Sequence, residues 1–321
     1  MIWTEPAWLE SVHEWTRSQL EPLGLELVGE IEQPHVMPWA TVLRAPTSSG
    51  PVWFKANVPA LAHEAAVVQI LVGQRPDLLP ELLATDLERG WMLQSDAGTK
   101  LRELLDEHRD FDVWEQILPL YAELQIAAAP ECERLLGAGA PDRRLRVLPG
   151  QFEELVGDRA TLASLTDDEL ERLRTLVPRI GAECRELESY AVPETIQHDD
   201  LHDGQVFVRD GRYVFLDWGD ACVSHPFFTL VVTLAVLAYK LELEHDSPHL
   251  DRFRDAYLEP WTRFRPRSDL EQAYPIAYRL GVLCRGLTWA LIVSAIPRPL
   301  RQQEEDAVPE RMRMLLEVYE V

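Results

Sequence analysis

The stretch of the chain that decides the fold is Ile196–Ala221, IQHDDLHDGQVFVRDGRYVFLDWGDA, which contains two histidines and six aspartates. Within it, Asp210-Gly211 separates two apolar runs, Val206–Val208 and Tyr213–Leu216. An Asp-Gly pair between two such runs is a strong signal for a two-residue β-hairpin turn. We therefore predict that the two runs are the strands of an antiparallel hairpin.

The register of this hairpin brings several oxygen atoms to one place. Pairing outward from the turn sets Gln205 opposite Leu216 and Asp217 opposite Gly204. Gln205 and Asp217 then emerge side by side at the open end, where the loop His198–Asp203 also enters. Carboxylate and amide oxygens without sulfur donors nearby suit a hard cation such as Mg²⁺. The segment therefore predicts a magnesium site at the open end of the hairpin.

Two other interpretations of the segment stay open at this point. His198 and His202 are four residues apart, as in the zinc-binding HExxH motif of metallohydrolases, but that motif needs a helix and a glutamate after its first histidine. Asp199 stands at that position, and the loop leads directly into a strand. The other interpretation is a polar loop before a strand, in which the aspartates only cap turns.

The composition limits the classes of protein to consider. The chain has 321 residues, enough for one large domain or two ordinary ones. Its 31 basic and 54 acidic residues give a formal net charge of −23. This charge argues against a nucleic-acid-binding surface and against binding to an anionic membrane, because both need clustered Lys and Arg. It is compatible with a cationic ligand.

The cysteines and the apolar stretches indicate the compartment. The four cysteines are scattered without zinc-site spacing, so we expect free thiols in a reducing compartment. The N-terminus has neither a basic region nor a continuous apolar segment, so we expect no signal peptide. Phe227–Tyr239 is too short to span a bilayer, and Arg285 interrupts Leu280–Ile296. We therefore expect a cytoplasmic protein in which both stretches are buried helices.

The chain changes character near Gly98. Strand-like runs precede it at Leu25–Glu32, Ala40–Ala45, Pro51–Ala56, Leu82–Leu87 and Gly90–Ser95, with one helix near Ala60–Val72. Helical patterns dominate after it, at Leu101–Arg109, Val113–Ala128, Asp168–Leu187, Pro226–Leu243, His249–Trp261, Ser268–Ala295 and Glu304–Val321. We predict an α+β fold with a small antiparallel-sheet lobe, residues 1–97, and a larger helical lobe, residues 98–321, with a ligand cleft between them.

A charged pair is predicted within the first lobe. Glu64 lies on the expected helix with Val67, Val68 and Leu71 at +3, +4 and +7, so its carboxylate shares the apolar face that turns inward. A buried carboxylate needs a partner. Lys55 on the neighbouring strand run is the obvious candidate. We therefore expect a Lys55–Glu64 ion pair.

These motifs resemble those of a known family. His198, Asp200 and Gln205 fit the spacing H-x-D-x-x-x-x-N of a kinase catalytic loop, with Gln where Asn is usual. Asp217, followed by Trp and Gly, stands where a metal-binding Asp-Phe-Gly would follow. The combined pattern HDDLHDGQ…FLDWGD resembles the aminoglycoside phosphotransferase family of small-molecule kinases. That resemblance implies the two-lobe protein-kinase-like fold.

The resemblance also implies a function and a site. The function is transfer of a phosphoryl group from ATP or GTP, with Mg²⁺, to a hydroxyl of a small molecule, by a monomer or homodimer. Asp200 is implied to orient the acceptor hydroxyl and accept its proton, and Gln205 and Asp217 to bind Mg²⁺. Lys55, held by Glu64, is implied to contact the nucleotide phosphates. The remaining implied residues are His198 as a brace of the loop, and Gln94 and Asp96, whose backbone atoms bind adenine.

The acceptor is the least determined part of this interpretation. The acidic charge favours an amine-bearing acceptor, such as an aminoglycoside or an amino sugar. Because the acceptor site of the family is built by the helical lobe, the candidate substrate contacts are Asp203, Trp218, Asp220, Arg285 and Trp289. Each of these residues has an alternative role in packing or loop anchoring.

Two departures from the family pattern keep a second function open. Gln205 in place of Asn moves the amide oxygen by about one C–C bond, roughly 1.5 Å, whereas Mg²⁺ requires near-ideal octahedral geometry. The first lobe also lacks a G-x-G-x-x-G motif, and its phosphate-covering turn is expected within Glu32–Thr41. The alternative is a nucleotide-binding pseudokinase without turnover.

Overall fold

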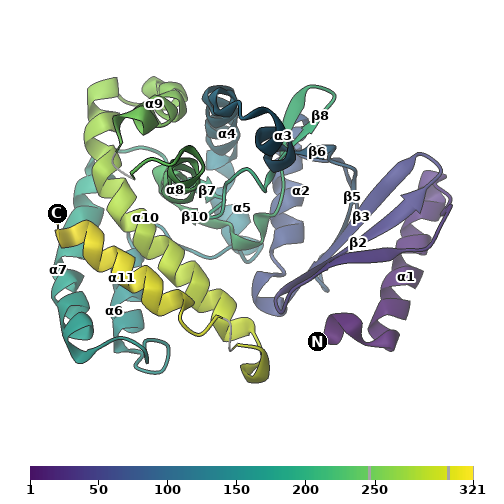
Figure 1. Ribbon diagram of the computed structural model, residues 1–321, viewed down its shortest axis with the longest axis horizontal. Helices are drawn as coiled ribbons and strands as arrows, with labels where there is room; N and C mark the ends of the chain where they lie inside the picture. The colour runs from purple at the N-terminus through teal and green to yellow at the C-terminus, as the bar shows by residue number, and fades with distance from the viewer. Residues whose placement is uncertain (245–246, 302–303, 321) are drawn as a thin grey trace.

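The fold begins with a five-stranded antiparallel sheet and continues into a larger helical part (Figure 1). The computed structural model describes residues 1–244, 247–301 and 304–320. The sheet has the order β1-β2-β3-β5-β4. Its strands are β1 (Glu32–Val36), β2 (Ala40–Thr47), β3 (Gly50–Asn57), β4 (Leu82–Asp86) and β5 (Trp91–Ser95). The α+β class is as predicted.

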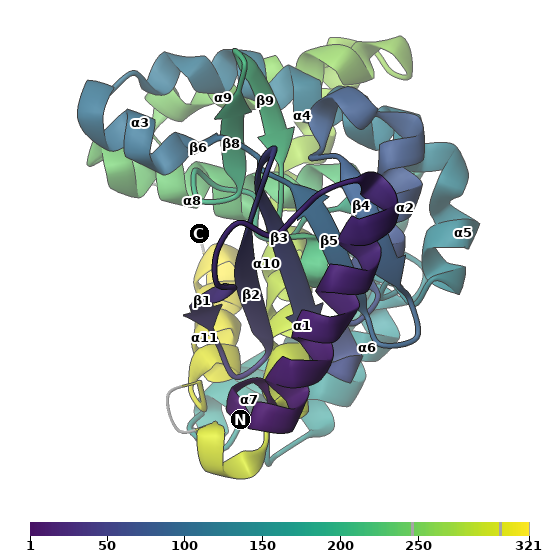
Figure 2. The ribbon, with the colours of Figure 1, turned by 90° about the vertical axis from the view of Figure 1, so that its right-hand side faces the viewer.

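The two faces of this sheet have different partners. Helix α1 (Pro6–Leu20) crosses the face that looks away from the helical part (Figure 2). Phe54 of β3 points to that side, where the rings of Trp8 and Trp15 meet it edge-on with centroids 6.2 and 5.7 Å away. Successive residues of a strand point to opposite faces. The neighbours of Phe54 along β3 therefore face the helical part, and Lys55 is one of them.

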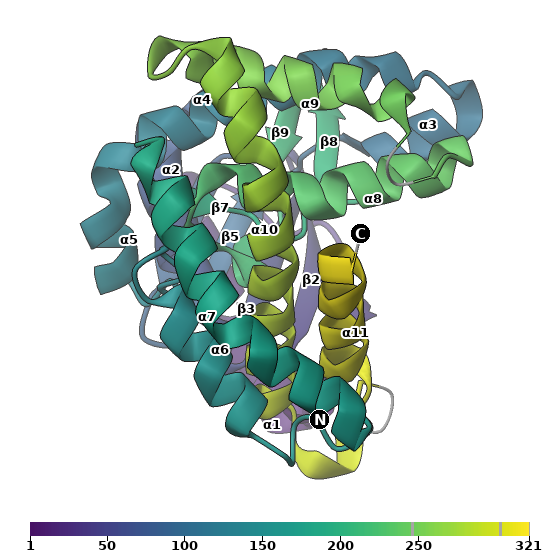
Figure 3. The same ribbon diagram turned by 90° about the vertical axis from the view of Figure 1, so that its left-hand side faces the viewer.

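The helical part is built around one long helix. Figure 3 shows α10 flanked by α6, α7 and α11. The helices of this part are α3 (Leu101–His108), α4 (Trp114–Ala128), α5 (Cys132–Gly137), α6 (Leu148–Gly157), α7 (Asp167–Ser189), α8 (Leu230–Leu241), α9 (Asp251–Leu258), α10 (Arg267–Ala295) and α11 (Ala307–Glu320). By length and composition α10 could cross a membrane, but 67% of its most apolar window is buried inside the protein, as in a core helix.

The predicted hairpin is confirmed with its register. Strands β8 (Val206–Arg209) and β9 (Arg212–Phe215) pair as expected from a turn at Asp210-Gly211. The backbone N–H of Leu216 donates to the carbonyl of Gln205 at 2.9 Å, so the pairing continues to the open end. Behind it, the short strands β7 (Thr195–Gln197) and β10 (Cys222–Ser224) pair with each other. The loops that follow β7 and β9 therefore leave the same region of the structure.

A glycine allows the two parts of the chain to join closely. Gly98 follows β5, has φ +90°, and precedes the short strand β6 (Thr99–Lys100), which pairs with β8. A Cβ atom at Gly98 would lie 2.2 Å from the carbonyl oxygen of Val208. No side chain fits there, so the connection between the sheet and the helical part requires glycine.

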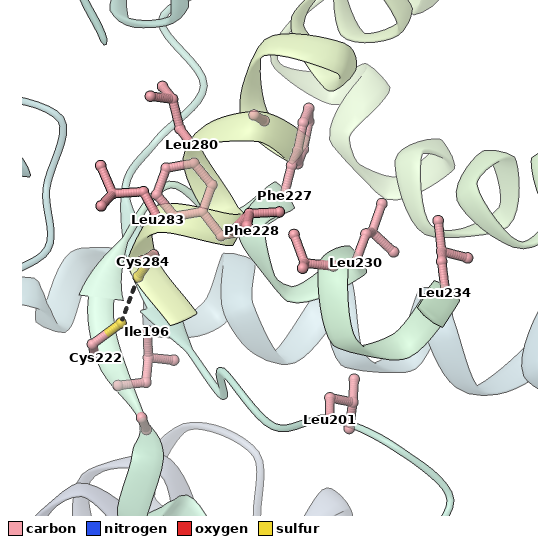
Figure 4. Close-up of a cluster of buried hydrophobic side chains, with 14 of the residues drawn as sticks. Ile196, Leu201, Cys222, Phe227, Phe228, Leu230, Leu234, Leu280, Leu283 and Cys284 are labelled. Atoms are coloured by element: carbon pink, nitrogen blue, oxygen red, sulfur yellow. Dashed lines mark hydrogen bonds between the residues drawn. The ribbon is translucent and has the colours of Figure 1, made fainter. Parts of the chain in front are cut away.

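An apolar cluster supports the loops from below. Ile196 of β7 and Leu201 of the following loop belong to one buried apolar cluster with Phe227 and with Leu283 of α10, part of which Figure 4 shows. The sulfur atoms of Cys222 and Cys284 approach to 3.8 Å in this cluster (Figure 4). All four cysteines are free thiols, as expected from their spacing. The loop after β7 therefore rests on the same core as α10.

Some predicted elements were wrong in extent or kind. The expected strand Leu25–Glu32 makes only one isolated bridge, between Leu27 and Thr47, and a strand starts only at Glu32. Leu25 and Leu27 pack beside the sheet core instead of extending its ladder. The pattern of apolar residues was therefore recognised correctly, but the segment pairs with β2 only around the Leu27–Thr47 bridge and forms no strand.

The helical predictions differ mainly at their ends. The expected helix near Ala60–Val72 is α2, Glu64–Gln74, preceded by a 3₁₀ turn, and Pro226 likewise opens a 3₁₀ turn before α8. His249–Trp261 is divided into a 3₁₀ turn, α9 and a second 3₁₀ turn that contains Pro260. Proline removes a backbone donor, which explains these boundaries. Helices α1, α5 and α6 were not predicted, and the expected end of the last helix at Val321 lies outside the described residues.

Candidate active site

A cavity of about 680 Å³ lies between the sheet and the helical part. Strands β2, β3 and β5 line one side, and the loops after β7 and β9 line the other. Its volume is within the range of pockets for small molecules and cofactors. Six of the residues predicted for catalysis, nucleotide binding and metal binding line this cleft: Lys55, Gln94, Asp96, Asp200, Gln205 and Asp217.

Lys55 joins three elements of the structure. Its Nζ lies 2.8 Å from the carboxylate of Glu64 on α2 and 2.5 Å from Oδ1 of Asp217, which follows β9. Glu64 is 1% exposed and also accepts hydrogen bonds from Asn57 Nδ2 at 2.5 Å and from the backbone N–H of Trp218 at 2.8 Å. The buried carboxylate therefore has partners on every side, as a buried charge requires.

The charges of Lys55 and Asp217 support each other. Burial alone would lower the pKa of Lys55, but the carboxylates of Asp217 and Glu64 outweigh it and raise that pKa. Burial alone would raise the pKa of Asp217, but Lys55 lowers it. Asp217 has φ +65°, and 48% of its side chain is exposed to the cleft. This cation and this carboxylate are thus both ionised and within reach of a ligand.

The loop after β7 is held by a buried histidine. His198 Nε2 lies 2.7 Å from the carbonyl oxygen of Leu216, and the backbone N–H of His198 donates to the hydroxyl of Tyr121 at 2.9 Å. Burial lowers the pKa of His198, so the ring is neutral. The ring therefore ties the loop after β7 to the end of β9.

Asp200 stands at the centre of this loop. Its Oδ1 accepts a hydrogen bond from Arg285 Nη2 at 2.7 Å. Its Oδ2 is 3.4 Å from Gln205 Nε2 and 3.4 Å from His202 Nε2. Burial alone would raise the pKa of Asp200, but Arg285 and His202 outweigh it and hold that pKa well below the usual range. Asp200 is therefore an ionised acceptor that faces the cleft.

Sequence reasoning missed the indole that covers the other end of the cleft. Trp53 lies two residues before Lys55, so both side chains are on the same face of β3, and both line the cleft. The Nε1–H of Trp53 donates to Asp96 Oδ1 at 2.8 Å. Arg209 Nη1 donates to the backbone carbonyl of Asp96 at 2.5 Å. Side chains on a strand alternate between its two faces, so counting back two residues from Lys55 along β3 would have identified Trp53 from the sequence.

The five predicted substrate contacts divide into two groups. Asp220, Arg285 and Trp289 line the cleft. Trp218 and Asp203 are each 1% exposed and do not line it. Trp218 stacks on Tyr121 with ring centroids 6.3 Å apart, and Asp203 accepts from Arg102 Nη2 at 2.8 Å and pairs with Lys240 at 3.6 Å. These contacts anchor the loop.

The residues at the open end of the hairpin fit Mg²⁺. Gln205 and Asp217 line the same cleft and offer only oxygen donors. Asp217 Oδ1 is used by Lys55, while the Gln205 amide nitrogen faces Asp200, which leaves its oxygen for another partner. Within the described ranges, no cluster of three or more His, Cys, Asp or Glu is arranged to hold a metal, so the zinc interpretation gains no support. The donor set is that of a hard cation whose remaining ligands come from water and phosphate.

The Lys55–Glu64 pair, Asp200 and Asp217 thus lie around one cleft, and the sequence matches a family model. A model of the phosphotransferase enzyme family (APH) matches residues 42–267, more than half of the chain. The chain belongs to the phosphotransferase enzyme family. The matched residues run from β2 to the start of α10 and include Lys55, Asp200 and Asp217. The family resemblance inferred from the motifs is thereby confirmed.

Solved structures of phosphotransferases share this fold. A macrolide 2′-phosphotransferase type I has a TM-score of 0.59 at 15% identity over 96% of this chain and 98% of that one. A choline kinase from Streptococcus pneumoniae has a TM-score of 0.59 at 13% identity over 96% and 100%. A choline kinase from Cryptosporidium parvum has a TM-score of 0.61 at 11% identity over 91% and 89%. No curated protein matches the sequence significantly. These likenesses show the protein-kinase-like fold.

Proposed function

We propose that this phosphotransferase transfers the γ-phosphoryl group of ATP or GTP, with Mg²⁺, to a hydroxyl of a small molecule. The observation that carries the proposal is the convergence on Lys55 Nζ of Glu64 from the sheet side and Asp217 from the hairpin side. This convergence sets an ionised lysine and an ionised, half-exposed carboxylate at the same point of the cleft. A nucleotide triphosphate bound with a divalent cation needs both charges at that point.

The nucleotide occupies the side of the cleft that the sheet lines. Trp53 offers a flat apolar face to the base, and Gln94 and Asp96 line the cleft at its edge. Lys55, held by Glu64, contacts the phosphates. Gln205 and Asp217 hold the Mg²⁺, which neutralises charge on the phosphates when it is bound. Because Asp96 already accepts the Nε1–H of Trp53, the base meets a preformed surface.

The transfer step assigns one role to Asp200. The acceptor hydroxyl oxygen attacks the γ-phosphorus, and the bond from that phosphorus to the β–γ bridging oxygen breaks. Asp200 orients the hydroxyl and receives its proton as the new P–O bond forms, and the nucleoside diphosphate leaves with the electron pair of the broken bond. The low pKa of Asp200 keeps it ionised and ready to accept a hydrogen bond at neutral pH. His198 keeps the loop in place.

The acceptor side of the cleft favours an amine-bearing molecule such as an amino sugar or an aminoglycoside. Asp199, Asp200 and Asp220 place three carboxylates around a single guanidinium, that of Arg285. The ionised carboxylate of Asp200 and the acidic net charge of the chain support the binding of an amine. The indole of Trp289 provides an apolar wall, with Trp39 from the β1–β2 turn 6.4 Å away. The remaining predicted contacts, Trp218 and Asp203, act in this proposal by anchoring the loop.

Further parts of the proposal concern the whole chain. We assign residues 1–97 to the nucleotide-binding lobe and residues 98–321 to the catalytic and acceptor-binding lobe, with Gly98 at the junction. The protein acts in the cytoplasm as a monomer or homodimer. Its partners are small molecules, and neither nucleic acid nor membrane takes part.

The test is nucleotide consumption across a panel of acceptors. ATP and GTP are each offered with Mg²⁺ and with aminoglycosides, amino sugars, neutral sugars and amino alcohols, and Asp200→Ala is the control. Turnover with one acceptor that falls by about 10³-fold or more in the variant, with nucleotide binding retained, is the expected result. Faster turnover of neutral sugars than of their amino analogues would contradict the amine-bearing acceptor. Absence of nucleotide binding would contradict the phosphate site itself.

Gln205 supports a second candidate, a nucleotide-binding pseudokinase. Its amide nitrogen faces Asp200 at 3.4 Å, and its longer side chain changes the position of the oxygen relative to the usual Asn. Mg²⁺ tolerates such changes poorly. This candidate predicts that Mg²⁺-nucleotide raises the melting temperature while no acceptor is phosphorylated. The same panel, with a thermal-shift measurement added, separates the two functions.

A further inference from the structure

The guanidinium of Arg285 lies behind the catalytic loop at the bottom of the cleft. Arg285 is 7% exposed, on α10, far in sequence from the loops that it contacts. Its Nη2 lies 2.7 Å from Asp200 Oδ1, and its Nη1 lies 2.6 Å from Asp220 Oδ2. Asp199 Oδ2 is 3.8 Å from Nη1. One side chain of α10 thus bonds both the loop after β7 and the loop after β9.

This arrangement costs more free energy than a contact that serves only stability would need. Removing three carboxylates and a guanidinium from water costs free energy that apolar residues of similar volume would avoid. Arginine also differs from lysine here, because its planar fork presents two nitrogens that can each bond one carboxylate. The Arg285 nitrogens are used in this way, one for Asp200 and one for Asp220. Such a fork sets the position of both carboxylates at once.

We propose that Arg285 is a positioning residue that holds Oδ1 of Asp200 and thereby presents Oδ2 to the acceptor hydroxyl. The inference rests on the proposed phosphotransferase function. In the described part of the chain, the contacts of Oδ2 are both at 3.4 Å, to Gln205 and His202, whereas Arg285 holds Oδ1 at 2.7 Å. The tightly held oxygen is occupied, and the loosely held oxygen can accept the hydroxyl proton.

The same fork relates the two catalytic loops to each other. Asp220 follows Asp217 by three residues, with a 3₁₀ turn at Trp218–Asp220 between them. Holding Asp220 therefore limits the movement of Asp217 relative to Asp200. Asp199 strengthens the clamp from behind: it stands at φ +62°, where its carboxylate accepts from Gln197 Nε2 at 2.8 Å and faces the guanidinium. The clamp thus links the hydroxyl-orienting residue to the metal-binding one.

The same helix offers a matched control. Arg279, six residues before Arg285 on α10, bonds the carboxylate of Glu183 on α7 with Nη2 at 3.0 Å and Nε at 3.2 Å. It is partly buried, and it does not line the cleft. Arg279→Gln therefore removes a comparable arginine–carboxylate contact from α10 without touching either catalytic loop.

The experiment compares Arg285→Gln and Arg285→Lys with Arg279→Gln. Amide hydrogen exchange is measured by mass spectrometry over residues 197–205 and 217–221, in the full-length protein. Turnover is measured with the acceptor found in the panel. We expect Arg285→Gln to speed exchange in both segments and to lower kcat by about 100-fold, as for a misplaced catalytic group. The KM for Mg²⁺-ATP should change by less than about threefold, because uniform nucleotide binding is untouched. Arg285→Lys should fall between this variant and the native protein.

Three outcomes decide against the proposal. Native exchange rates and a kcat within about threefold of native in Arg285→Gln would show that the clamp does not position Asp200. Equal losses in Arg285→Gln and Arg279→Gln would show a general effect on α10. Parallel loss of kcat and nucleotide binding in Arg285→Gln would show a structural role. If Arg285→Gln does not fold, Arg285→Lys decides by the same criteria.

Failure of the proposed function would look different. In that case the native protein phosphorylates no acceptor or binds no nucleotide. The exchange measurement still tests the clamp, because it requires no turnover. Faster exchange at 197–205 in Arg285→Gln and not in Arg279→Gln would then support the positioning of the loop, and equal exchange would overturn it.

Discussion

Two cations in the same cleft are each held between two carboxylates, and the two sites differ in their access to ligands. Lys55 has Glu64 at 2.8 Å and Asp217 at 2.5 Å. Arg285 has Asp200 at 2.7 Å and Asp220 at 2.6 Å. In the lysine site, nearly half of the Asp217 side chain is exposed. In the arginine site all the partners are largely buried.

This difference in access suggests two roles, ligand binding at the lysine site and positioning of the loops at the arginine site. A compact ammonium next to a half-exposed carboxylate can exchange one partner for a phosphate or a metal ion, because the site is open to the cleft. A planar guanidinium with a carboxylate on each nitrogen has no such freedom. We therefore propose that the lysine site receives the nucleotide and that the arginine site keeps the loops after β7 and β9 in register.

The largest expected effect is a difference in kcat between two variants, each of which replaces one carboxylate in one of the two sites. Asp217→Asn should lower kcat by about 10³-fold and remove the Mg²⁺ dependence of nucleotide binding, because it deletes the ionised ligand opposite Lys55. Asp220→Asn should cost less than about tenfold, because burial raises the pKa of Asp220 to about 7 and the amide imitates its protonated form. Steady-state kinetics and a Mg²⁺ titration of nucleotide affinity measure both. Equal losses in the two variants would erase the distinction between the sites.

The next effect concerns the buried partner of Lys55. Glu64→Gln keeps the shape of the side chain but removes the charge that Lys55, Asn57 and the backbone of Trp218 share. We expect the free energy of unfolding to fall by about 1.5–3 kcal/mol, the usual value for hydrogen bonds to a charged group. Urea denaturation measures the change. Glu169→Gln is a suitable control, because Glu169 is a helix-capping carboxylate remote from the cleft. A stability equal to that of the native protein would show that the pair contributes to function alone.

A smaller effect should appear in the pH dependence of stability. The pKa of Asp220 in the folded protein is about 7, raised by burial from an ordinary value of 3.8. A raised carboxyl pKa means that the folded state holds the proton more tightly. The contribution is therefore fully present below pH 3.8 and is lost as the pH rises through about 7.

The native protein and Asp220→Asn should therefore diverge with pH. From the acidic to the neutral end of this window, the variant should gain stability relative to the native protein by on the order of 4 kcal/mol. Urea unfolding at several pH values measures the difference, and other titrating groups cancel in the comparison. A constant difference across the window would show that Arg285 keeps Asp220 ionised throughout, and the arginine site would then resemble the lysine site electrostatically.

The sequence predicted one of these two sites and not the other, for a physical reason. Lys55 and Glu64 are nine residues apart, and helical periodicity alone put the carboxylate on the inner face. The hairpin register was equally local, because Asp210-Gly211 determines it. Arg285 reaches Asp200 across 85 residues of sequence, and no short-range pattern reports where α10 lies. Arg285 was predicted as a substrate contact and as a break in an apolar stretch, but its bonds to Asp200 and Asp220 were not foreseen.

Other errors have the same origin in tertiary packing. Leu25–Glu32 has the composition of a strand, but strand formation depends on a partner edge, and only Leu27 finds one, at Thr47. Asp199 has a left-handed backbone, with φ +62°. Its carboxylate then points to Arg285, a consequence that could be recognised only after α10 was in place.

The smallest expected effect concerns Gln205, which lies between the lysine site and the arginine site. Gln205 lines the cleft beside Asp217 of the lysine site, and its amide nitrogen faces Asp200 of the arginine site at 3.4 Å. Gln205→Asn shortens the side chain to the length that is usual in the family. We expect the Mg²⁺ concentration for half-maximal turnover to change by about threefold, because Mg²⁺ is sensitive to the position of each oxygen ligand. Stability should stay within about 0.5 kcal/mol of native, as for other substitutions away from the core.

The direction of that change separates two accounts of Gln205. A lower Mg²⁺ requirement in Gln205→Asn, with unchanged nucleotide affinity without metal, would mean that the longer side chain weakens the metal site of an otherwise complete enzyme. A higher requirement would mean that the backbone at Gln205 is set back to suit glutamine, so that the departure from the family pattern is compensated within this chain. Identical Mg²⁺ titrations would remove Gln205 from the metal site and leave Asp217 as the protein ligand that the lysine site contributes.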